Sequence, residues 1–205
     1  MSVYFYGCIS LDGYLATKDH DLTWLYESGT TESTGYNKFY EKMDIVVMGR
    51  KTFNEILKVG KPYQFYPKTK NYVFTSDTTI REEGFKFINQ DVVEFIKTLD
   101  KNKNIWIVGG NTLVAPLLDH DLFDVMYIQI APVLLGEGIP LFTQKSQLKR
   151  YELKKVHQYD QFAELIYYKN NGWNIDKKHI SFIYVYLKVK AYLRGIIWVY
   201  SSKYI

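Results

Sequence analysis

The sequence of 205 residues is long enough for one domain with its own core and too short for several. Hydrophobic residues make up 47% and charged residues 23%, a balance that excludes a fibrous or intrinsically disordered chain. The net charge of +4 is unevenly distributed: residues 170–205 hold six Lys or Arg against one Asp, whereas residues 1–169 hold 20 basic and 21 acidic residues. For the first 169 residues we therefore expect neither a nucleic acid nor a membrane as partner.

The cysteine and histidine content indicates the cellular compartment and limits the kinds of metal site that the protein could have. The single cysteine, Cys8, excludes an intrachain disulfide and a CxxC metal site, and it is typical of a reducing compartment. The four histidines show no HxH or HxxxH spacing, so no metal site is expected. The N-terminal run MSVYFYGCISLDG lacks the basic start and the cleavage site of a signal peptide, and we interpret it as a first strand of a cytoplasmic protein.

Short apolar runs alternate with segments of helical periodicity through the first two thirds of the chain. This pattern is typical of an α/β domain whose parallel strands are buried on both faces. The predicted strands are Val3–Ile9, Ile45–Met48, Asn71–Thr75, Phe85–Ile88, Ile105–Val108 and Val125–Pro132. The predicted helices are Ser33–Lys42, Lys51–Lys58, Asp91–Leu99 and Asn111–Leu118, and we expect Asp91 to cap the third of them.

The pattern changes after Pro140. Tyr151–His157 and Phe162–Tyr168 are separated by four polar or aromatic residues and predict an antiparallel hairpin that closes one edge of the sheet. We therefore expect a domain over residues 1–169, followed by a basic, aromatic tail of unknown role over residues 170–205.

The tail contains an apolar stretch, Ile180–Tyr200, with Lys188, Lys190 and Arg194 near its centre. Each of these charges costs about 2.5 to 3.5 kcal/mol at the centre of a membrane helix, whereas each large apolar residue returns only about 0.3 to 0.6 kcal/mol. The sum excludes a membrane span. A peripheral amphipathic helix, additional strands and a non-functional extension remain alternatives.

Three predicted strands end in glycine or a small hydroxyl residue just before a helix or a turn: Ile45–Thr52, Val73–Asp77 and Ile105–Thr112. Ligands of α/β sheets bind at the carboxyl ends of strands, where helix N-termini attract phosphate. Together the three sites predict a ligand with several phosphates, although each one alone is more typical of a turn or a solvated helix start. Neither GxGxxG nor GxxxxGK[ST] occurs, so a Rossmann domain and a P-loop are excluded.

Four segments carry a resemblance to a known family: Cys8–Ala16, Val47–Thr52, Ile107–Gly110 and Leu135–Phe142. In order and spacing they resemble the dihydrofolate-reductase-like superfamily, in particular the branch with the reductase domain of riboflavin biosynthesis. The resemblance implies an α/β fold with a mixed, mainly parallel sheet flanked by helices and a C-terminal antiparallel hairpin. It also implies NADPH as hydride donor and a homodimer.

The same resemblance implies which residues would bind the cofactor. Gly49, Arg50, Lys51 and Thr52 would hold phosphates, Thr75 and Ser76 would line the adenosine end, Gly109, Gly110, Asn111 and Thr112 would embrace the pyrophosphate, and Leu15 and Ala16 would lie beside the nicotinamide. Arg50 and Lys51 are the candidates for the 2′-phosphate, although Asp77 is an unfavourable neighbour for an anion. From the residues themselves, Asn111 or Thr112 is also expected to cap the following helix.

The substrate side is less defined, and no catalytic residue is assigned. Dihydrofolate reductases place a carboxylate early in their first helix; Glu32 lies near that place, but a helix-start glutamate is also a routine partner of the helix dipole. Asp12 and Gln129 are candidate substrate-binding residues, although Asp12 precedes a glycine and also predicts a turn, and Gln129 can point out of the sheet. Cys8 is expected to be a buried small side chain and not a nucleophile.

The leading hypothesis is an NADPH-dependent reductase that transfers hydride to a small heterocyclic or sugar-bearing substrate, of the type that reduces 5-amino-6-(5-phosphoribosylamino)uracil. The zinc signature of the deaminase domain that often accompanies this reductase is absent from the sequence, so a stand-alone reductase inside or outside that pathway is expected. The alternatives are a dihydrofolate reductase, a nucleotide-binding module without catalysis, and a tail that binds a membrane surface or nucleic acid.

Overall fold

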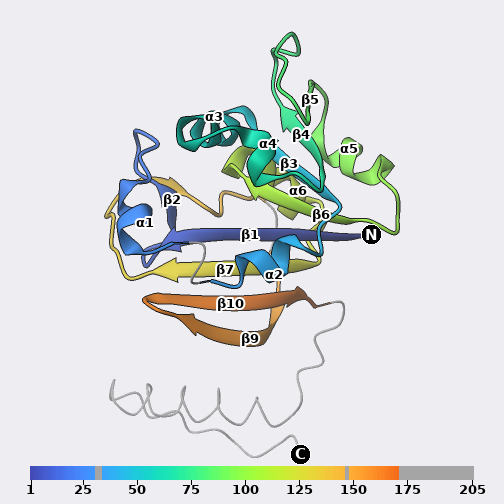
Figure 1. The fold of residues 1–205 in the computed structure, drawn as a ribbon. Helices are drawn as coiled ribbons and strands as arrows, with labels where there is room; N and C mark the ends of the chain where they lie inside the picture. Colours follow the sequence, from blue (N-terminus) through green and yellow to red (C-terminus); the bar gives the residue numbers. More distant parts are fainter. Residues whose placement is uncertain (31–33, 146–147, 171–205) are drawn as a thin grey trace, which may run out of the picture. The chain divides into compact units, whose positions relative to one another are not determined.

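The computed structural model describes residues 1–30, 34–145 and 148–170. All but the last of these residues belong to one compact unit, Met1–Lys169 (Figure 1). Glu32 and the predicted tail beyond Asn170 lie outside the described residues, so the interpretations given for them remain predictions.

The described residues form a main sheet of eight strands. These are β1 (Ser2–Ser10), β3 (Ile45–Gly49), β4 (Lys70–Phe74), β5 (Phe85–Ile88), β6 (Asn104–Gly109), β7 (Val125–Ala131), β9 (Tyr151–Tyr159) and β10 (Phe162–Lys169). Their order in space is β5-β4-β3-β6-β1-β7-β10-β9. The first six pair in parallel, whereas β10 is antiparallel to β7 and to β9. The predicted mixed, mainly parallel sheet and its C-terminal hairpin are therefore confirmed.

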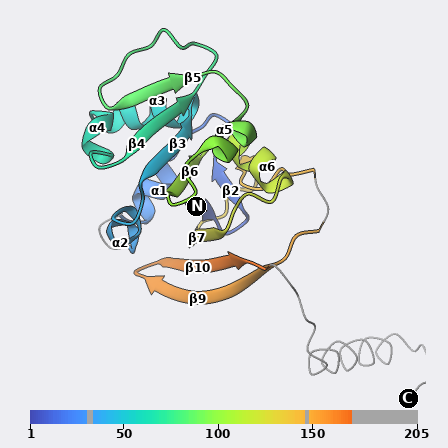
Figure 2. The ribbon, with the colours of Figure 1, turned by 90° about the vertical axis from the view of Figure 1, so that its right-hand side faces the viewer.

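Helices cover both faces of this sheet. They are α1 (Thr23–Ser28), α2 (Tyr36–Tyr40), α3 (Arg50–Val59), α4 (Pro62–Phe65), α5 (Val92–Thr98) and α6 (Asn111–Asp119). Figure 2 shows α5 and α6 on one side of the sheet and α2 and α4 on the other. A second, small sheet pairs β2 (Tyr14–Ala16) with β8 (Ile139–Pro140).

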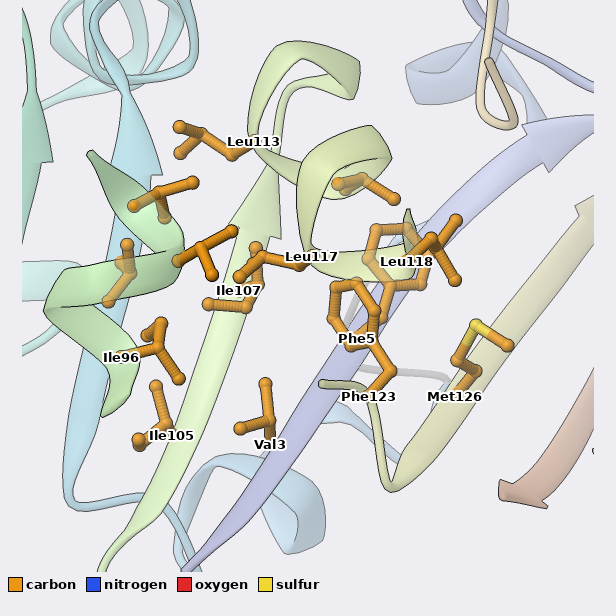
Figure 3. Packing of buried hydrophobic residues seen from close by; sticks show 14 of the residues in the cluster. Val3, Phe5, Ile96, Ile105, Ile107, Leu113, Leu117, Leu118, Phe123 and Met126 are labelled. Atoms are coloured by element: carbon orange, nitrogen blue, oxygen red, sulfur yellow. The ribbon is translucent and has the colours of Figure 1, made fainter. Parts of the chain in front are cut away.

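The larger core lies between the sheet and the pair α5 and α6. Phe5, Ile105 and Ile107 project from the central strands and meet Ile96 of α5 and Leu117 of α6, all of them buried (Figure 3). Residues that alternate with them along the same strands are buried on the opposite face. Because both faces are covered, the parallel strands are mainly apolar, which is the pattern that identified them in the sequence.

The opposite face carries a core that is rich in aromatic rings. Tyr6 lies at its centre, with ring centroids 4.6 Å from Phe39 of α2, 5.7 Å from Tyr127 of β7 and 6.3 Å from Trp106 of β6. Burial of the hydroxyl groups raises the pKa of Tyr6 and Tyr36 well above the ordinary value and the pKa of Tyr127 to about 12. These hydroxyls stay protonated in the folded protein over the physiological range.

Three details differ from the predictions. The helix predicted over Ser33–Lys42 is shorter, because α2 begins only at Tyr36 after Gly35. The short elements α1, α4, β2 and β8 were not predicted, since none has enough residues to show a period. Asn111 and Thr112 do not cap α6, because Gly110 occupies the N-cap position and no side chain caps the helix. The predicted cap of α5 is confirmed: the Asp91 carboxylate accepts a hydrogen bond from the Glu94 backbone N–H.

Alkaline pH is expected to destabilise the fold. In the unfolded chain tyrosine loses its proton near pH 10, whereas the buried tyrosines keep theirs, so the free energy of unfolding falls as the pH rises through about 10. Each such tyrosine adds a slope of about 1.4 kcal/mol per pH unit. Urea unfolding followed by circular dichroism measures this effect, and a midpoint that stays constant up to about pH 11 would contradict it.

Candidate functional site

The carboxyl ends of β3 and β6 lie against each other. A Cβ atom added to Gly49 would lie 3.8 Å from both the Gly109 carbonyl oxygen and the Gly110 nitrogen, and one added to Gly110 would lie 4.0 Å from Thr52 Oγ1. The peptide bond between Gly109 and Gly110 is cis. The structure thus brings together four of the residues predicted to hold phosphates.

Two helix N-termini meet at the same point. The N-caps of α3 and α6 are Gly49 and Gly110, both with extended backbone, and neither helix start has a side-chain cap. The first N–H groups of a helix have no partner within the helix and carry the positive end of its dipole. Glycine leaves the approach to them open, so this point suits an anion.

Arg50 supplies a fixed positive charge beside these N-termini. Its guanidinium carbon lies 5.5 Å from the ring centroid of Phe53 and 5.9 Å from that of Phe87. The nitrogen Nη1 is buried and has no hydrogen-bond partner among the described residues. Because a buried, unpaired donor on a cation is costly, this arrangement favours an anionic ligand at Arg50.

Further cationic and hydroxyl side chains predicted to bind the cofactor are Lys51, Thr75 and Ser76. Lys51 is exposed, and its Nζ lies 2.9 Å from His20 Nε2 in the loop after β2. Thr75 and Ser76 follow β4, the neighbour of β3 in the sheet. Asp77 is held by hydrogen bonds from Thr79, which are the largest cause of its lowered pKa, and the Arg50 charge lowers that pKa further.

Leu15 and Ala16 lie on β2, which is held in place by the segment Leu135–Leu141. Gly138 of that segment lies so close that an added Cβ atom would collide with the Ala16 carbonyl oxygen. Asp12 also serves this attachment, because its carboxylate accepts hydrogen bonds from the backbone N–H groups of Leu135 and Gly136 and from the Ser10 hydroxyl. Its predicted contact with substrate stays a prediction.

Replacing Gly138 by alanine is expected to displace β2 and to destabilise the protein by about 1 to 3 kcal/mol, because the backbone of Ala16 cannot yield as a flexible side chain could. Thermal unfolding measures this loss. Gly49→Ala is the matched control, since its new Cβ atom meets only ordinary contacts at 3.8 to 3.9 Å. Equal stability of the two variants would contradict the prediction.

Gln129 points into the protein and belongs to a buried polar cluster on the α2 side of the sheet. Its Nε2 donates hydrogen bonds to the Tyr6 hydroxyl at 2.8 Å and to Glu164 Oε2 at 3.2 Å. The other carboxylate oxygen, Oε1 of Glu164, lies 3.2 Å from His157 Nδ1. Gln129 and Asp12 thus have different hydrogen-bond partners, and the predicted contact of Gln129 with substrate also stays a prediction.

Sequence reasoning missed Glu164, although the signal was present. In the alternating strand Phe162–Lys169, Glu164 occupies an inward position between Phe162 and Ile166, and its exposed fraction is only 1%. A charged residue at an inward position of a strand marks a functional or strained site. The Cys8 side chain is partly buried and not fully buried as predicted. Desolvation still raises the pKa of its thiol to about 12, which fits the expectation that it is not a nucleophile at neutral pH.

Comparison with known proteins places this arrangement in a family. The model of the RibD C-terminal domain matches residues 2–163. A curated relative, the uncharacterized protein YwjB of Bacillus subtilis, is 37% identical over 165 residues, which are 79% of this chain and 94% of that protein.

Solved structures show the same fold. A riboflavin-biosynthesis-related protein from Shewanella sp. PV-4 matches with a TM-score of 0.73 at 26% identity, over 83% of this chain and 100% of that one. The Thermotoga maritima deaminase and 5-amino-6-(5-phosphoribosylamino)uracil reductase matches with 0.62 at 17% identity, over 82% of this chain and 56% of that one. Dihydrofolate reductase of Enterococcus faecalis, complexed with NADP(H), matches with 0.56 at 16% identity, over 83% and 97%.

The sheet order, the strand-end glycines and these matches define a protein with the dihydrofolate-reductase-like fold. More narrowly, the chain belongs to the RibD C-terminal domain family. Within the described residues, no helix is long and apolar enough to cross a membrane.

Proposed function

We propose that the chain is an NADPH-dependent reductase that transfers hydride to a small heterocyclic or sugar-bearing substrate, of the riboflavin-reductase type. The observation that carries this proposal is the meeting of two uncapped helix N-termini at Gly49 and Gly110 beside the unpaired Nη1 of Arg50. Family membership supports it, and so does the NADP(H) bound to the related fold of the Enterococcus enzyme.

The residues present fit this cofactor. The gap between the strand ends accepts a polyphosphate, because no Cβ atom fills it at Gly49, Gly109 or Gly110. Arg50 would pair with phosphate oxygens through the donor that now lacks a partner. Leu15 and Ala16 would shield the reacting ring from water, since Ala16 is buried and Leu15 packs against the main core.

When bound, NADPH supplies the hydride, so the protein has to align the two reactants and exclude water. β1 carries the loop toward β2 at its carboxyl end, and Gln129 of the neighbouring strand lies opposite Cys8, two residues before that end. We place the substrate on this face of the sheet, between the β2 loop and Gln129. The chain thereby holds hydride donor and acceptor at the ends of adjacent strands.

The proposed function is tested with the full-length protein in a folded state. We expect NADPH to quench the tryptophan fluorescence and to receive energy transfer, and we expect faster oxidation of NADPH with 5-amino-6-(5-phosphoribosylamino)uracil than with dihydrofolate. Absence of any response at millimolar NADPH would refute the proposal. Binding with higher turnover of dihydrofolate would instead favour a dihydrofolate reductase.

Arg50→Gln is expected to raise the Kd for NADPH about tenfold, which corresponds to about 1.4 kcal/mol, and to change the Kd for NADH much less. The reason is that Arg50 would pair with the 2′-phosphate, which NADH lacks. Lys58→Gln is the matched control, because Lys58 lies in the last turn of the same helix and pairs with Glu55. An equal loss for both cofactors would assign Arg50 to the pyrophosphate and contradict this prediction.

A further inference from the structure

A polar row crosses four neighbouring strands on the α2 side of the sheet. In the strand register, Cys8 of β1 lies opposite Gln129 of β7, Gln129 opposite Glu164 of β10, and Glu164 opposite His157 of β9. Paired residues of adjacent strands project to the same face. The row therefore runs from the strand that leads to the β2 loop outward to the edge of the sheet.

Glu164 is the most unusual member of this row. Among the described residues it is the only acidic side chain that is buried, and the only basic side chain in contact with its carboxyl group there is His157, whose Nδ1 lies 3.2 Å from Oε1. Removing a carboxylate from water is costly unless hydrogen bonds satisfy it. Such a group is seldom needed for folding, because a well-packed apolar residue of similar size serves stability at least as well.

Hydrogen bonds fix the orientation of the Gln129 amide. Both contacts of Nε2 are with acceptors, the Tyr6 hydroxyl oxygen and Glu164 Oε2, so both amide hydrogens are used. Turning the amide over would place its carbonyl oxygen against the Glu164 carboxylate, which is repulsive. The Tyr6 hydroxyl, kept protonated by its burial, donates its own hydrogen to Thr34 Oγ1 at 3.4 Å and leaves a lone pair for Gln129.

In this arrangement the amide oxygen of Gln129 has no hydrogen-bond donor among the described residues. Within the described part of the chain, Oε1 forms no hydrogen bond. On the same face, Trp24 of α1 packs with Cys8 and Ala131, and its buried Nε1 also lacks a partner among the described residues. An unpaired acceptor and an unpaired buried donor on one face call for a ligand that carries the complementary pair.

We propose that Glu164 is a positioning residue that fixes the amide of Gln129, so that its carbonyl oxygen accepts a hydrogen bond from an N–H donor of a lactam-type substrate ring. The inference rests on the proposed function, which places the substrate on this face. Trp24 Nε1 then donates to a carbonyl oxygen of the same ring. Glu164 itself does not touch the substrate, and it acts through the amide that it orients.

Two probes with the same ring test this inference. Uracil carries ring N–H donors, and 1,3-dimethyluracil is the same ring with these donors blocked. Ligand-observed NMR on the full-length protein, with and without NADPH, gives the ratio of the two affinities. We expect the wild type to prefer uracil by about tenfold, the value of one hydrogen bond between the ring and the Gln129 amide.

Glu164→Gln removes the charge that orients the amide while keeping the size of the side chain, so the preference is expected to fall below about threefold. Gln129→Met removes the acceptor itself and should give the same loss with the Glu164–His157 pair intact. Glu152→Gln, an exposed glutamate on β9, is the matched control and should keep the preference. Thermal unfolding shows that each variant is folded.

Three results would overturn the inference: no binding of uracil by the wild type, no preference in the wild type, or an unchanged preference in folded Glu164→Gln. If Glu164→Gln does not fold, the Gln129→Met variant tests the inference instead, because an unchanged preference for uracil in that variant also refutes it. The measurement without NADPH separates this outcome from the proposed function. If the protein does not bind NADPH but keeps a preference that depends on Glu164, the reductase proposal is refuted and the inference stands. If it binds NADPH but shows no preference, the inference about Gln129 and Glu164 is refuted and the reductase proposal stands.

Discussion

The close approach of β3 and β6 at their carboxyl ends is the constraint on which the candidate site depends. Adjacent parallel strands bring the starts of α3 and α6 to one point, where Gly49, Gly109 and Gly110 themselves contribute no side chain. The other residues of the candidate site are positioned by elements that begin or end near this point. Arg50 extends from the first residue of α3, and the segment after β4 follows on the neighbouring strand.

A change of direction in the sheet separates the two halves of the site. The parallel strands from β5 to β7 present their carboxyl ends on one side, where the helix N-termini attract phosphate. The chain then adds an antiparallel hairpin, in which β9 runs in the same direction as β7 but is followed by the turn to β10 and not by a helix. Its strands instead carry side chains across the face of the sheet, where Glu164 contacts Gln129 and His157 contacts Glu164. The proposed function thus assigns the binding of the charged cofactor and the orientation of an uncharged ring to different parts of the fold.

The sequence allowed most of the scaffold to be predicted, since its information is local. Continuous apolar runs such as Ile45–Met48 identify strands buried on both faces, and Asp91 identifies a helix start through its own hydrogen bond. The strand-end glycines follow from the same pattern. The family resemblance indicated which of them would meet a cofactor.

What could not be predicted depends on contacts between distant residues. Asp12 predicts a turn or a ligand equally well until the structure shows it bound to backbone N–H groups 123 and 124 residues away. The face of the sheet to which the Gln129 side chain projects could not be predicted, because a strand that is buried on both faces has no exposed polar side that would indicate its orientation. The partnership of Gln129 with Glu164 requires the pairing of β7 with β10, which no local pattern specifies.

The position of β1 has a consequence for the order in which the protein is made. The first strand of the chain occupies the interior of the sheet, where Ser2 pairs with Asn104 on one side and Tyr4 with Val125 on the other. Until β6 and β7 have emerged from the ribosome, this apolar strand has no neighbours and is exposed to wrong pairing. Completion of the sheet is therefore a late event in synthesis, and a chain truncated before β7 would carry an unprotected edge in place of a centre.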